Sequence, residues 1–348
     1  MNISVAMIIK RGEEKDLRRC LSSLKDIAFE IIAVTSPPND DTSDETERVL
    51  AQFNAKTFYF AWTGDFSQAR NESLKYATGD YVLVIDTDEY VKKFNFKPED
   101  DVNAYRIIRE NEYTDSDMAL VNNERLNRLF RNGLFHYEGR VHEQLVPNDK
   151  TECPAKYTDV VIGHTGYADP SVMLEKSRLY REGLFKMLLT SPDDPYVLFQ
   201  IGRTYYVEKD YGNAITYFEK ALELDPDPEL EYVELLLETY GYALLNHKEP
   251  EKAMAVFGVY DEFSRFADYL FLCGLILMNN ARFDEAIEEF LKATRTNRFS
   301  VQGVNSYLAY YNCGVIRECL GDRTGAIEYY SKCGNYPPAE DAIKRCSG

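Results

Sequence analysis

Two acidic residues suited to metal binding, Asp86 and Asp88, directly follow the apolar run YVLVI at residues 81–85. A continuous apolar run of this kind is typical of a buried parallel strand. Side chains two positions apart at a strand end point the same way, so the two carboxylates should converge. Because converging carboxylates repel each other unless a cation joins them, the pair predicts a site for Mg²⁺ or Mn²⁺ that also bridges a diphosphate.

A second group of reactive side chains lies in the segment DFSQARN at residues 65–71. This segment places Asp65, Arg70 and Asn71 around the expected start of a helix. The free N–H groups of a helix N-terminus and a nearby guanidinium favour a phosphate ligand. The alternative is structural: the helix is simply capped, and Arg70 pairs with Asp65.

Three of the four histidines fall between residues 135 and 164. His142 stands next to Glu143, and His164 follows a short apolar run at residues 160–163. A single histidine is more often a hydrogen-bonded structural residue than a ligand. Three in so short a stretch favour a functional site, since imidazole serves both as a base and as a metal ligand.

The elements that must position these residues alternate between strands and helices. Strands are predicted at residues 3–9, 30–34, 56–60 and 81–85, and helices around residues 17–24, 42–53 and 67–77. This alternation predicts a mostly parallel sheet with helices on both faces. In such sheets ligands bind beyond the carboxyl ends of the strands, where Asp86 and Asp88 stand.

From about residue 170 the chain has a helical pattern throughout, with an internal repeat close to the 34-residue tetratricopeptide unit. Plain helical hairpins that support the first half are one interpretation. The other is a concave groove that binds a peptide or a partner. The residues at repeat spacing are Gly202, Tyr205, Ala214, Phe218, Ala221 and Pro226, then Gly241, Ala253 and Phe257, then Gly274, Ala286, Phe290 and Ala293, and finally Gly314, Ala326, Tyr330 and Pro338.

The composition narrows the class of protein. The 348 residues carry 58 acidic and 40 basic side chains, a net charge of -18, which argues against nucleic acid and anionic membranes as partners. Residues 3–9 are too short an apolar run for a signal-peptide core or a membrane span. Seven cysteines without a CxxC pair fit reduced thiols. We therefore expect a cytoplasmic protein.

Taken together, these motifs resemble inverting family 2 glycosyltransferases of the GT-A fold. The resemblance is to the bacterial subgroup with tetratricopeptide repeats after the catalytic domain, which includes the S-glycosyltransferases of sublancin-type peptides. It implies an α/β GT-A domain over residues 1–170 and an all-α tetratricopeptide-repeat domain over residues 171–348. The matching stretches are MIIK (7–10), RCL (19–21), EIIAV (30–34), DFSQARN (65–71), ATGDYVLVIDTDE (77–89), RLFRN (128–132), EGRVHEQL (138–145) and GHTGY (163–167).

The resemblance also implies roles for individual residues. Asp86 and Asp88 would hold Mn²⁺ or Mg²⁺ and the diphosphate of a nucleotide sugar, with His164 as the third metal ligand. Arg70 and Asn71 would contact the nucleotide, and Asp65 would orient Arg70.

Glu143 is the candidate general base in this resemblance, and His142 is the alternative base or a neighbouring support. An inverting transfer needs a base to take the proton of the attacking hydroxyl or thiol. The expected donor is a UDP-sugar. The expected acceptor is a peptide or protein, at a Ser or Thr hydroxyl or a Cys thiol, held by the repeats. A homodimer is a further expectation.

One departure concerns Thr35. Relatives commonly read D-T-G-S-T-D after the second strand, and their first Asp binds the nucleobase; here the stretch is TSPPND at residues 35–40. Threonine can hydrogen-bond a base, but without charge and with less reach. Two other hypotheses therefore stand beside the leading one: a degenerate sugar-nucleotide domain acting as a binding module, and a polysaccharide glycosyltransferase.

Overall fold

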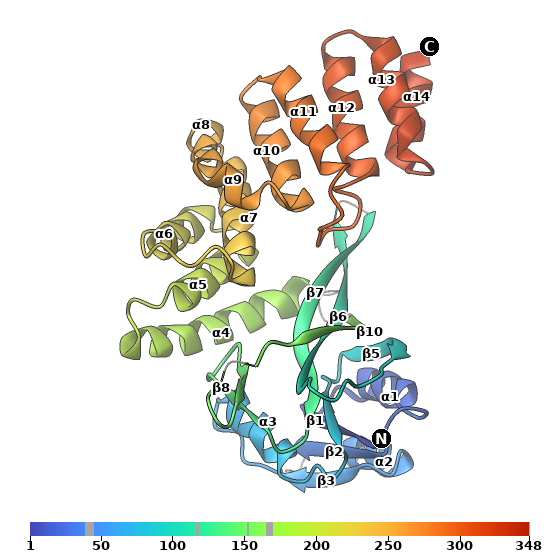
Figure 1. Ribbon diagram of the computed structural model, residues 1–348, viewed down its shortest axis with the longest axis vertical. Helices are drawn as coiled ribbons and strands as arrows, with labels where there is room; N and C mark the ends of the chain where they lie inside the picture. Colours follow the sequence, from blue (N-terminus) through green and yellow to red (C-terminus); the bar gives the residue numbers. More distant parts are fainter. Residues whose placement is uncertain (39–44, 116–117, 152, 165–169, 348) are drawn as a thin grey trace. The chain divides into compact units, whose positions relative to one another are not determined.

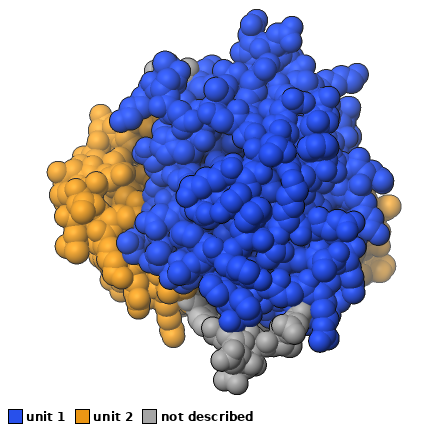
Figure 2. Space-filling view, turned by 90° about the horizontal axis from the view of Figure 1, so that it is seen from below, with its two compact units in different colours: residues 1–173 blue, residues 174–348 orange. Residues whose placement is uncertain are grey.

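The structure is a computed structural model that describes residues 1–38, 45–115, 118–151, 153–164 and 170–347 (Figure 1). The chain divides into two compact units, Met1–Met173 and Leu174–Gly348, which Figure 2 distinguishes by colour. None of the described helices contains a stretch long and apolar enough to cross a membrane.

Unit 1 is built on an eight-stranded mixed sheet. The first four strands in the order are parallel to one another, whereas β7 is antiparallel to both its neighbours and β5 is antiparallel to β10. A separate pair joins β8 (Phe135–Glu138) to β9 (Gln144–Pro147). The sheet order is β3 (Lys56–Tyr59), β2 (Glu30–Thr35), β1 (Ile3–Ile9), β4 (Tyr81–Val84), β7 (Met118–Arg131), β6 (Ala104–Asp115), β10 (Lys156–His164) and β5 (Glu89–Asn95).

Helices cover both faces of this sheet, as the sequence predicted. The buried side chains of α1 (Glu14–Ser23) and α2 (Glu45–Gln52) share one core with Val5 and Met7 of β1. Ala6, between them, faces the other core, against which α3 (Phe66–Leu74) packs through Leu74. The alternation along β1 is the period-two alternation of a strand buried on both faces.

The four predicted strands β1 to β4 are confirmed, but the remainder of the sheet differs from a mostly parallel one. Strands β6 and β7 form a long antiparallel hairpin, and β7 attaches it to β4. Their sequence is rich in Arg, Asn and Glu, which hides the alternation that indicates a strand. Residues 42–44 of the predicted second helix lie outside the described part of the chain.

The start of β2 is fixed by a buried carboxylate. Glu30 accepts hydrogen bonds from Ser4 Oγ at 2.5 Å, Lys56 Nζ at 2.6 Å and the backbone N of Thr78 at 2.7 Å. Burial by itself raises the pKa of the Glu30 carboxyl, but these hydrogen bonds outweigh it and lower the pKa to about 2.

Glu30 should therefore make the stability of unit 1 sensitive to acid. Because the pKa is depressed in the folded chain, the stabilisation is complete above the ordinary value of 4.5 and is lost as the pH falls toward 2. We expect a loss of about 2–3 kcal/mol in the free energy of unfolding. Urea unfolding followed by the fluorescence of Trp62 measures it. The Glu30→Gln variant should have a lower free energy of unfolding at neutral pH and should lose less of it in acid. Equal losses in acid for the variant and the parent would contradict this assignment.

Unit 2 is made of helices. Most are antiparallel neighbours joined by short turns, and α4 begins at the end of unit 1. The elements are α4 (Pro170–Thr190), α5 (Pro195–Val207), α6 (Tyr211–Leu222), α7 (Glu231–Asn246), α8 (Pro250–Ala253), η1 (Met254–Val259), α9 (Tyr260–Phe263), α10 (Ala267–Asn279), α11 (Phe283–Ala293), α12 (Tyr307–Cys319), α13 (Arg323–Tyr330), η2 (Ser331–Cys333) and α14 (Pro337–Ser347).

The repeat pattern has a direct packing cause in three of the four repeats. A Cβ atom on Gly202, on Gly274 or on Gly314 would lie 2.5 to 2.6 Å from an aromatic ring sixteen residues later in the chain, in Phe218, Phe290 and Tyr330 respectively. The glycines thus let paired helices approach closely.

The second repeat departs from this pattern. Gly241 packs against Leu272 of α10, and the expected helix around Phe257 is broken into α8, η1 and α9. Gly258 lies inside this segment, and glycine disfavours a continuous helix.

Candidate active site

Asp86 lies in a network of charges just beyond the end of β4. Its carboxylate pairs with Arg70 Nη2 of α3 at 3.0 Å and with Arg128 Nη2 of β7 at 3.1 Å. In the antiparallel register of β4 and β7, Leu83 faces Leu129, so Arg128 reaches the end of β4 from the neighbouring strand. The pairing of β4 with β7 thus brings Asp86, which stands in a predicted motif, next to Arg128, for which the sequence predicted no role.

Arg70 also donates its Nε to Glu143, in the segment between β8 and β9. Both side chains are buried, with 5% of Arg70 and 11% of Glu143 exposed. The Arg70 guanidinium lies 5.7 Å from the ring centre of Tyr137 in β8. The predicted nucleotide-binding arginine and the predicted base are therefore direct neighbours.

The arginines of this network stabilise the ionised form of Asp86. Burial opposes the ionisation of Asp86, but the Arg128 and Arg70 guanidinium groups outweigh it and hold the pKa of Asp86 well below its usual range. Burial raises the pKa of Tyr137 to about 12, so its phenol is protonated at neutral pH.

Three hydrogen-bond donors of this network are unused. Among the described residues, Arg70 Nη1, Arg128 Nη1 and the Tyr137 hydroxyl are buried and have no hydrogen-bond partner. Buried donors without acceptors cost free energy. A ligand with several negatively charged oxygens, such as a diphosphate, would supply the missing acceptors.

Asp88 meets His164 on the other side of the strand end. His164 Nε2 lies 3.3 Å from Asp88 Oδ2, and His164 Nδ1 lies 2.8 Å from Asn111 Oδ1. In the tautomer whose Nδ1 donates to Asn111, the Nε2 lone pair is available to a metal, which is how a metal-binding histidine is held. A cation between the two groups would have one ligand from each.

The register of β10 explains how His164 arrives there. β10 is antiparallel to β5 with His164 opposite Glu89, the residue after Asp88, and parallel to β6 with His164 opposite Asn111. The rest of the GHTGY motif, residues 165–167, lies outside the described part of the chain.

The donor set fits a hard divalent ion through Asp88 and His164, which offer one oxygen and one nitrogen. Asp86 and Asp88 were expected to hold the metal ion together as a pair. Asp86 differs from this expectation, because Arg70 and Arg128 already neutralise its carboxylate. Within the described residues, a set of three carboxylates in unit 2, on α7 and α10, has one oxygen from each residue within 4.8 Å of the others. Asp86, Asp88 and His164 are gathered at one strand end without closing to that distance.

Two predicted nucleotide-binding residues have structural bonds. Asp65 caps α3, accepting from Gln68 N at 3.2 Å and from Ser67 Oγ at 2.7 Å. Asn71 bonds the backbone of Tyr137 through both its amide atoms, at 2.8 and 2.7 Å. Asp65 therefore supports the start of the helix, and the groups that orient Arg70 are Asp86 and Glu143.

Thr35 ends β2 and is almost fully buried, and its hydroxyl has no hydrogen-bond partner among the described residues. Its neighbour in the register is Tyr59, whose hydroxyl donates to Glu47 Oε1 at 3.2 Å. Arg11 holds the same Glu47 oxygen at 2.6 Å and the Ser36 carbonyl at 3.0 Å. A carboxylate from α2 thus lies near the position where relatives have an aspartate.

His142 has an unusual backbone. Its φ is +54°, a left-handed value that non-glycine residues rarely adopt, and its carbonyl accepts from Gln144 Nε2 at 3.0 Å. Backbone strain of this kind is concentrated at functional sites. It sets the direction of the chain where Glu143 turns inward to Arg70.

Sequence reasoning assigned no role to Arg128, Tyr137, Glu89 or Asn111. Glu89 is fully buried and accepts from Arg109 Nη1 and from the backbone N of Asp86, so it fixes the turn that carries both aspartates. Arg128 stands in the RLFRN motif, and Glu89 is the last residue of the ATGDYVLVIDTDE stretch. Membership in these motifs is the sequence signal that could have pointed to the two residues. Their partners depend on strand register, which the sequence pattern does not reveal.

Comparison with known families assigns the two units. Residues 4–98 match the family described as Glycosyl transferase family 2, a span that runs from β1 to just past β5 and contains Arg70, Asp86 and Asp88. Residues 195–228 and 267–299 match descriptions of the Tetratricopeptide repeat.

Two curated proteins are similar to this chain over much of its length. The TPR repeat-containing protein Synpcc7942_0270 of Synechococcus elongatus is 29% identical over 270 residues, covering 73% of this chain and 64% of that protein. The SPbeta prophage-derived glycosyltransferase SunS of Bacillus subtilis is 30% identical over 230 residues, covering 62% of this chain and 52% of that protein. The chain thus spans between about half and two thirds of the length of these relatives.

Solved structures similar to this chain include tetratricopeptide proteins. YrrB, described as a TPR protein with an unusual peptide-binding site, aligns with a TM-score of 0.41 and 20% identity over 51% of this chain and 92% of its own. MamA from Desulfovibrio magneticus aligns with a TM-score of 0.40 and 21% identity over 51% and 91%. The family matches alone carry the conclusion: residues 4–98 form part of a glycosyl transferase family 2 domain, and tetratricopeptide repeats follow it at residues 195–228 and 267–299.

Proposed function

We propose that the chain is an inverting, metal-assisted glycosyltransferase that moves a sugar from a nucleotide sugar to a peptide or protein. The observation that carries the proposal is the meeting of Arg70, Asp86 and Glu143 beside Asp88 and His164, at one strand end of a domain that matches glycosyl transferase family 2. The family match supports the transfer of a sugar, and the contacts of these residues support the roles proposed for them.

The unused donors support a nucleoside diphosphate sugar as the donor substrate. Arg70 Nη1, Arg128 Nη1 and the Tyr137 hydroxyl are free to donate hydrogen bonds to phosphate oxygens. A divalent ion held by Asp88 and His164 would neutralise the charge that develops on the departing diphosphate. We expect a UDP-sugar, with Thr35 and Glu47 near the base.

The transfer itself forms one bond and breaks one. The acceptor oxygen or sulfur attacks the anomeric carbon, the bond from that carbon to the diphosphate breaks, and the diphosphate leaves with the electron pair. Glu143 takes the acceptor proton, and Arg70 holds the Glu143 carboxylate in place. Attack from the face opposite the diphosphate inverts the anomeric configuration.

We further propose that the repeats present the acceptor, since stacked repeats of this kind form extended binding surfaces. All seven cysteines are free thiols and most are buried, which supports a reducing, cytoplasmic setting.

The direct test is incubation of the full chain with a panel of nucleotide sugars and Mn²⁺, with assay of the released nucleotide and the mass of added peptides. We expect release with one donor class, loss of release when the metal is chelated, and recovery when Mn²⁺ is restored. Release at the same rate with excess chelator would remove the metal from the mechanism.

A binding module is the second candidate, and the unpartnered, uncharged Thr35 is the observation that favours it. Calorimetric titration with nucleoside diphosphates separates the candidates. Binding without turnover of any donor favours the module, and absence of binding with or without Mn²⁺ contradicts the enzyme.

A further inference from the structure

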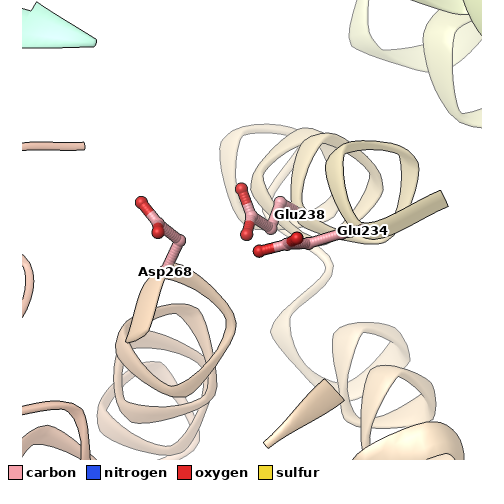
Figure 3. A group of neighbouring side chains, drawn as sticks. All are labelled: Glu234, Glu238 and Asp268. Carbon is pink, nitrogen blue, oxygen red and sulfur yellow. The ribbon is translucent and has the colours of Figure 1, made fainter. Parts of the chain in front are cut away.

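Three carboxylates from neighbouring helices of unit 2 meet, and none of them belongs to the candidate active site of unit 1. Glu234 and Glu238 stand one helical turn apart on α7, and Asp268 lies in the first turn of α10, which packs against α7. One carboxylate oxygen from each of the three residues lies within 4.8 Å of the other two. In Figure 3 the side chains of Glu234 and Glu238 lie next to each other and extend toward the side on which Asp268 lies.

This cluster is buried and incompletely bonded, unlike an ordinary acidic surface. Only 8% of Glu238 and 3% of Asp268 are exposed. Glu238 Oε1 is buried and has no hydrogen-bond partner among the described residues, and the side chain points into the cluster (Figure 3). A buried carboxylate oxygen without a partner is destabilising unless a positive charge or a donor reaches it.

Asp268 supplies a rigid part of the cluster. Its Oδ2 accepts from the backbone N of Ser300 at 2.7 Å and its Oδ1 from the backbone N of Val301 at 2.8 Å. Each carboxylate oxygen keeps a second lone pair, so the bonded Asp268 can still coordinate an ion. The glutamates of α7 stand four residues apart, on one face of the helix, and reach Asp268 from the opposite side.

Burial and acidic neighbours dominate the electrostatics of Glu238. Burial is the largest cause that raises the pKa of its carboxyl, and repulsion from Asp268 and Glu234 adds to it. Burial also raises the pKa of Asp268 against its two backbone hydrogen bonds. Glu238 thus lies close to two other acidic groups, and a cation bound between them would offset the repulsion.

We propose that Glu234, Glu238 and Asp268 form a binding site for a hard divalent cation, with Ca²⁺ as the preferred ion, that ties together two neighbouring repeats. Oxygen-only ligands select hard cations, and Ca²⁺ accepts irregular oxygen geometry more readily than Mg²⁺ does. The ion would link α7 to α10 and, through Asp268, to the loop at Ser300 and Val301. The site is separate in residues and in chemistry from Asp88 and His164.

The test uses the full chain, stripped of metal, in the Asp88→Asn background so that the candidate active site does not contribute. Calorimetric titration with CaCl₂ should show one site per chain. Thermal unfolding should shift upward by roughly 2–4 °C when free Ca²⁺ is about fivefold above its dissociation constant. Titration with MnCl₂ and MgCl₂ compares the ions.

The variant Glu238→Gln should remove both the calorimetric site and the Ca²⁺-dependent shift. It should not lower the unfolding temperature of the metal-free chain, because it relieves carboxylate repulsion; this shows that the variant is folded. Glu251→Gln, an exposed carboxylate on α8, is the matched control and should behave as the parent. Absence of binding by the parent, or Ca²⁺ binding retained in folded Glu238→Gln, would overturn the proposal.

Discussion

Asp86→Asn and Asp88→Asn should disable the proposed transferase in two different ways. Asp86 sits between Arg70 and Arg128, so its neutralisation leaves two buried guanidinium groups facing each other. We expect a loss of about 2–3 kcal/mol in the free energy of unfolding, below the full cost of a broken buried pair because a quarter of Asp86 is exposed. Activity should fall with stability.

Asp88→Asn should leave the free energy of unfolding within about 1 kcal/mol of the parent, since the change conserves the shape of the side chain. Turnover should fall by about 10²–10³-fold, because a metal ligand at the leaving group is weakened. Excess Mn²⁺ should recover part of the activity of this variant and none of that of Asp86→Asn.

Two measurements decide between these outcomes: urea unfolding followed by Trp62, and the rate of nucleotide release as a function of Mn²⁺ concentration. If both variants lose stability equally, the two aspartates share one structural role. If Asp88→Asn has the Mn²⁺ dependence of the parent, Asp88 is not a metal ligand.

The part of the fold that the sequence predicted is the part whose signal is local. The apolar runs of β1, β2 and β4 are fully or almost fully buried, and a run of this kind is readable without knowledge of its neighbours. The β6–β7 hairpin was not predicted, because its strands carry charged side chains such as Arg109 and Glu124, which pair across the hairpin. In such strands polar residues are satisfied by a neighbour that the pattern does not identify.

The site follows the same division. Asp86, Asp88 and Arg70 stand in motifs that predict chemistry, and the structure brings them to one strand end. Arg128 reaches Asp86 through the pairing of β7 with β4, and Asn111 reaches His164 through the pairing of β6 with β10. Register is a property of the whole sheet, so the partners of each motif could not be read from its own spacing.

The repeats give a third example. Gly202 and Phe218 stand at repeat spacing in the sequence, and the structure places them in contact. Gly241 and Phe257 have the same spacing, but Gly241 packs against Leu272. The spacing predicts that a close approach occurs, and the identity of the partner depends on the broken helix between α7 and α10.

The general base is decided by a matched pair of substitutions, Glu143→Gln and His142→Asn. Glutamine keeps the shape of Glu143 and can still accept a hydrogen bond from Arg70, but it cannot take a proton at neutral pH. We expect kcat to fall by about 10²–10⁴-fold with little change in the KM for the donor. Asparagine tolerates the left-handed φ of His142, so His142→Asn should keep the backbone and leave kcat within about threefold of the parent.

Chemical rescue separates a base from a residue that only holds Arg70. In Glu143→Ala, added formate should restore a measurable fraction of the transfer rate, because a small carboxylate can enter the space beside Arg70 and take the acceptor proton. Chloride at equal ionic strength is the control, since it can pair with Arg70 but is too weak a base. Equal rescue by both anions assigns Glu143 to positioning alone, and a large loss in His142→Asn with an active Glu143→Gln assigns the base to His142.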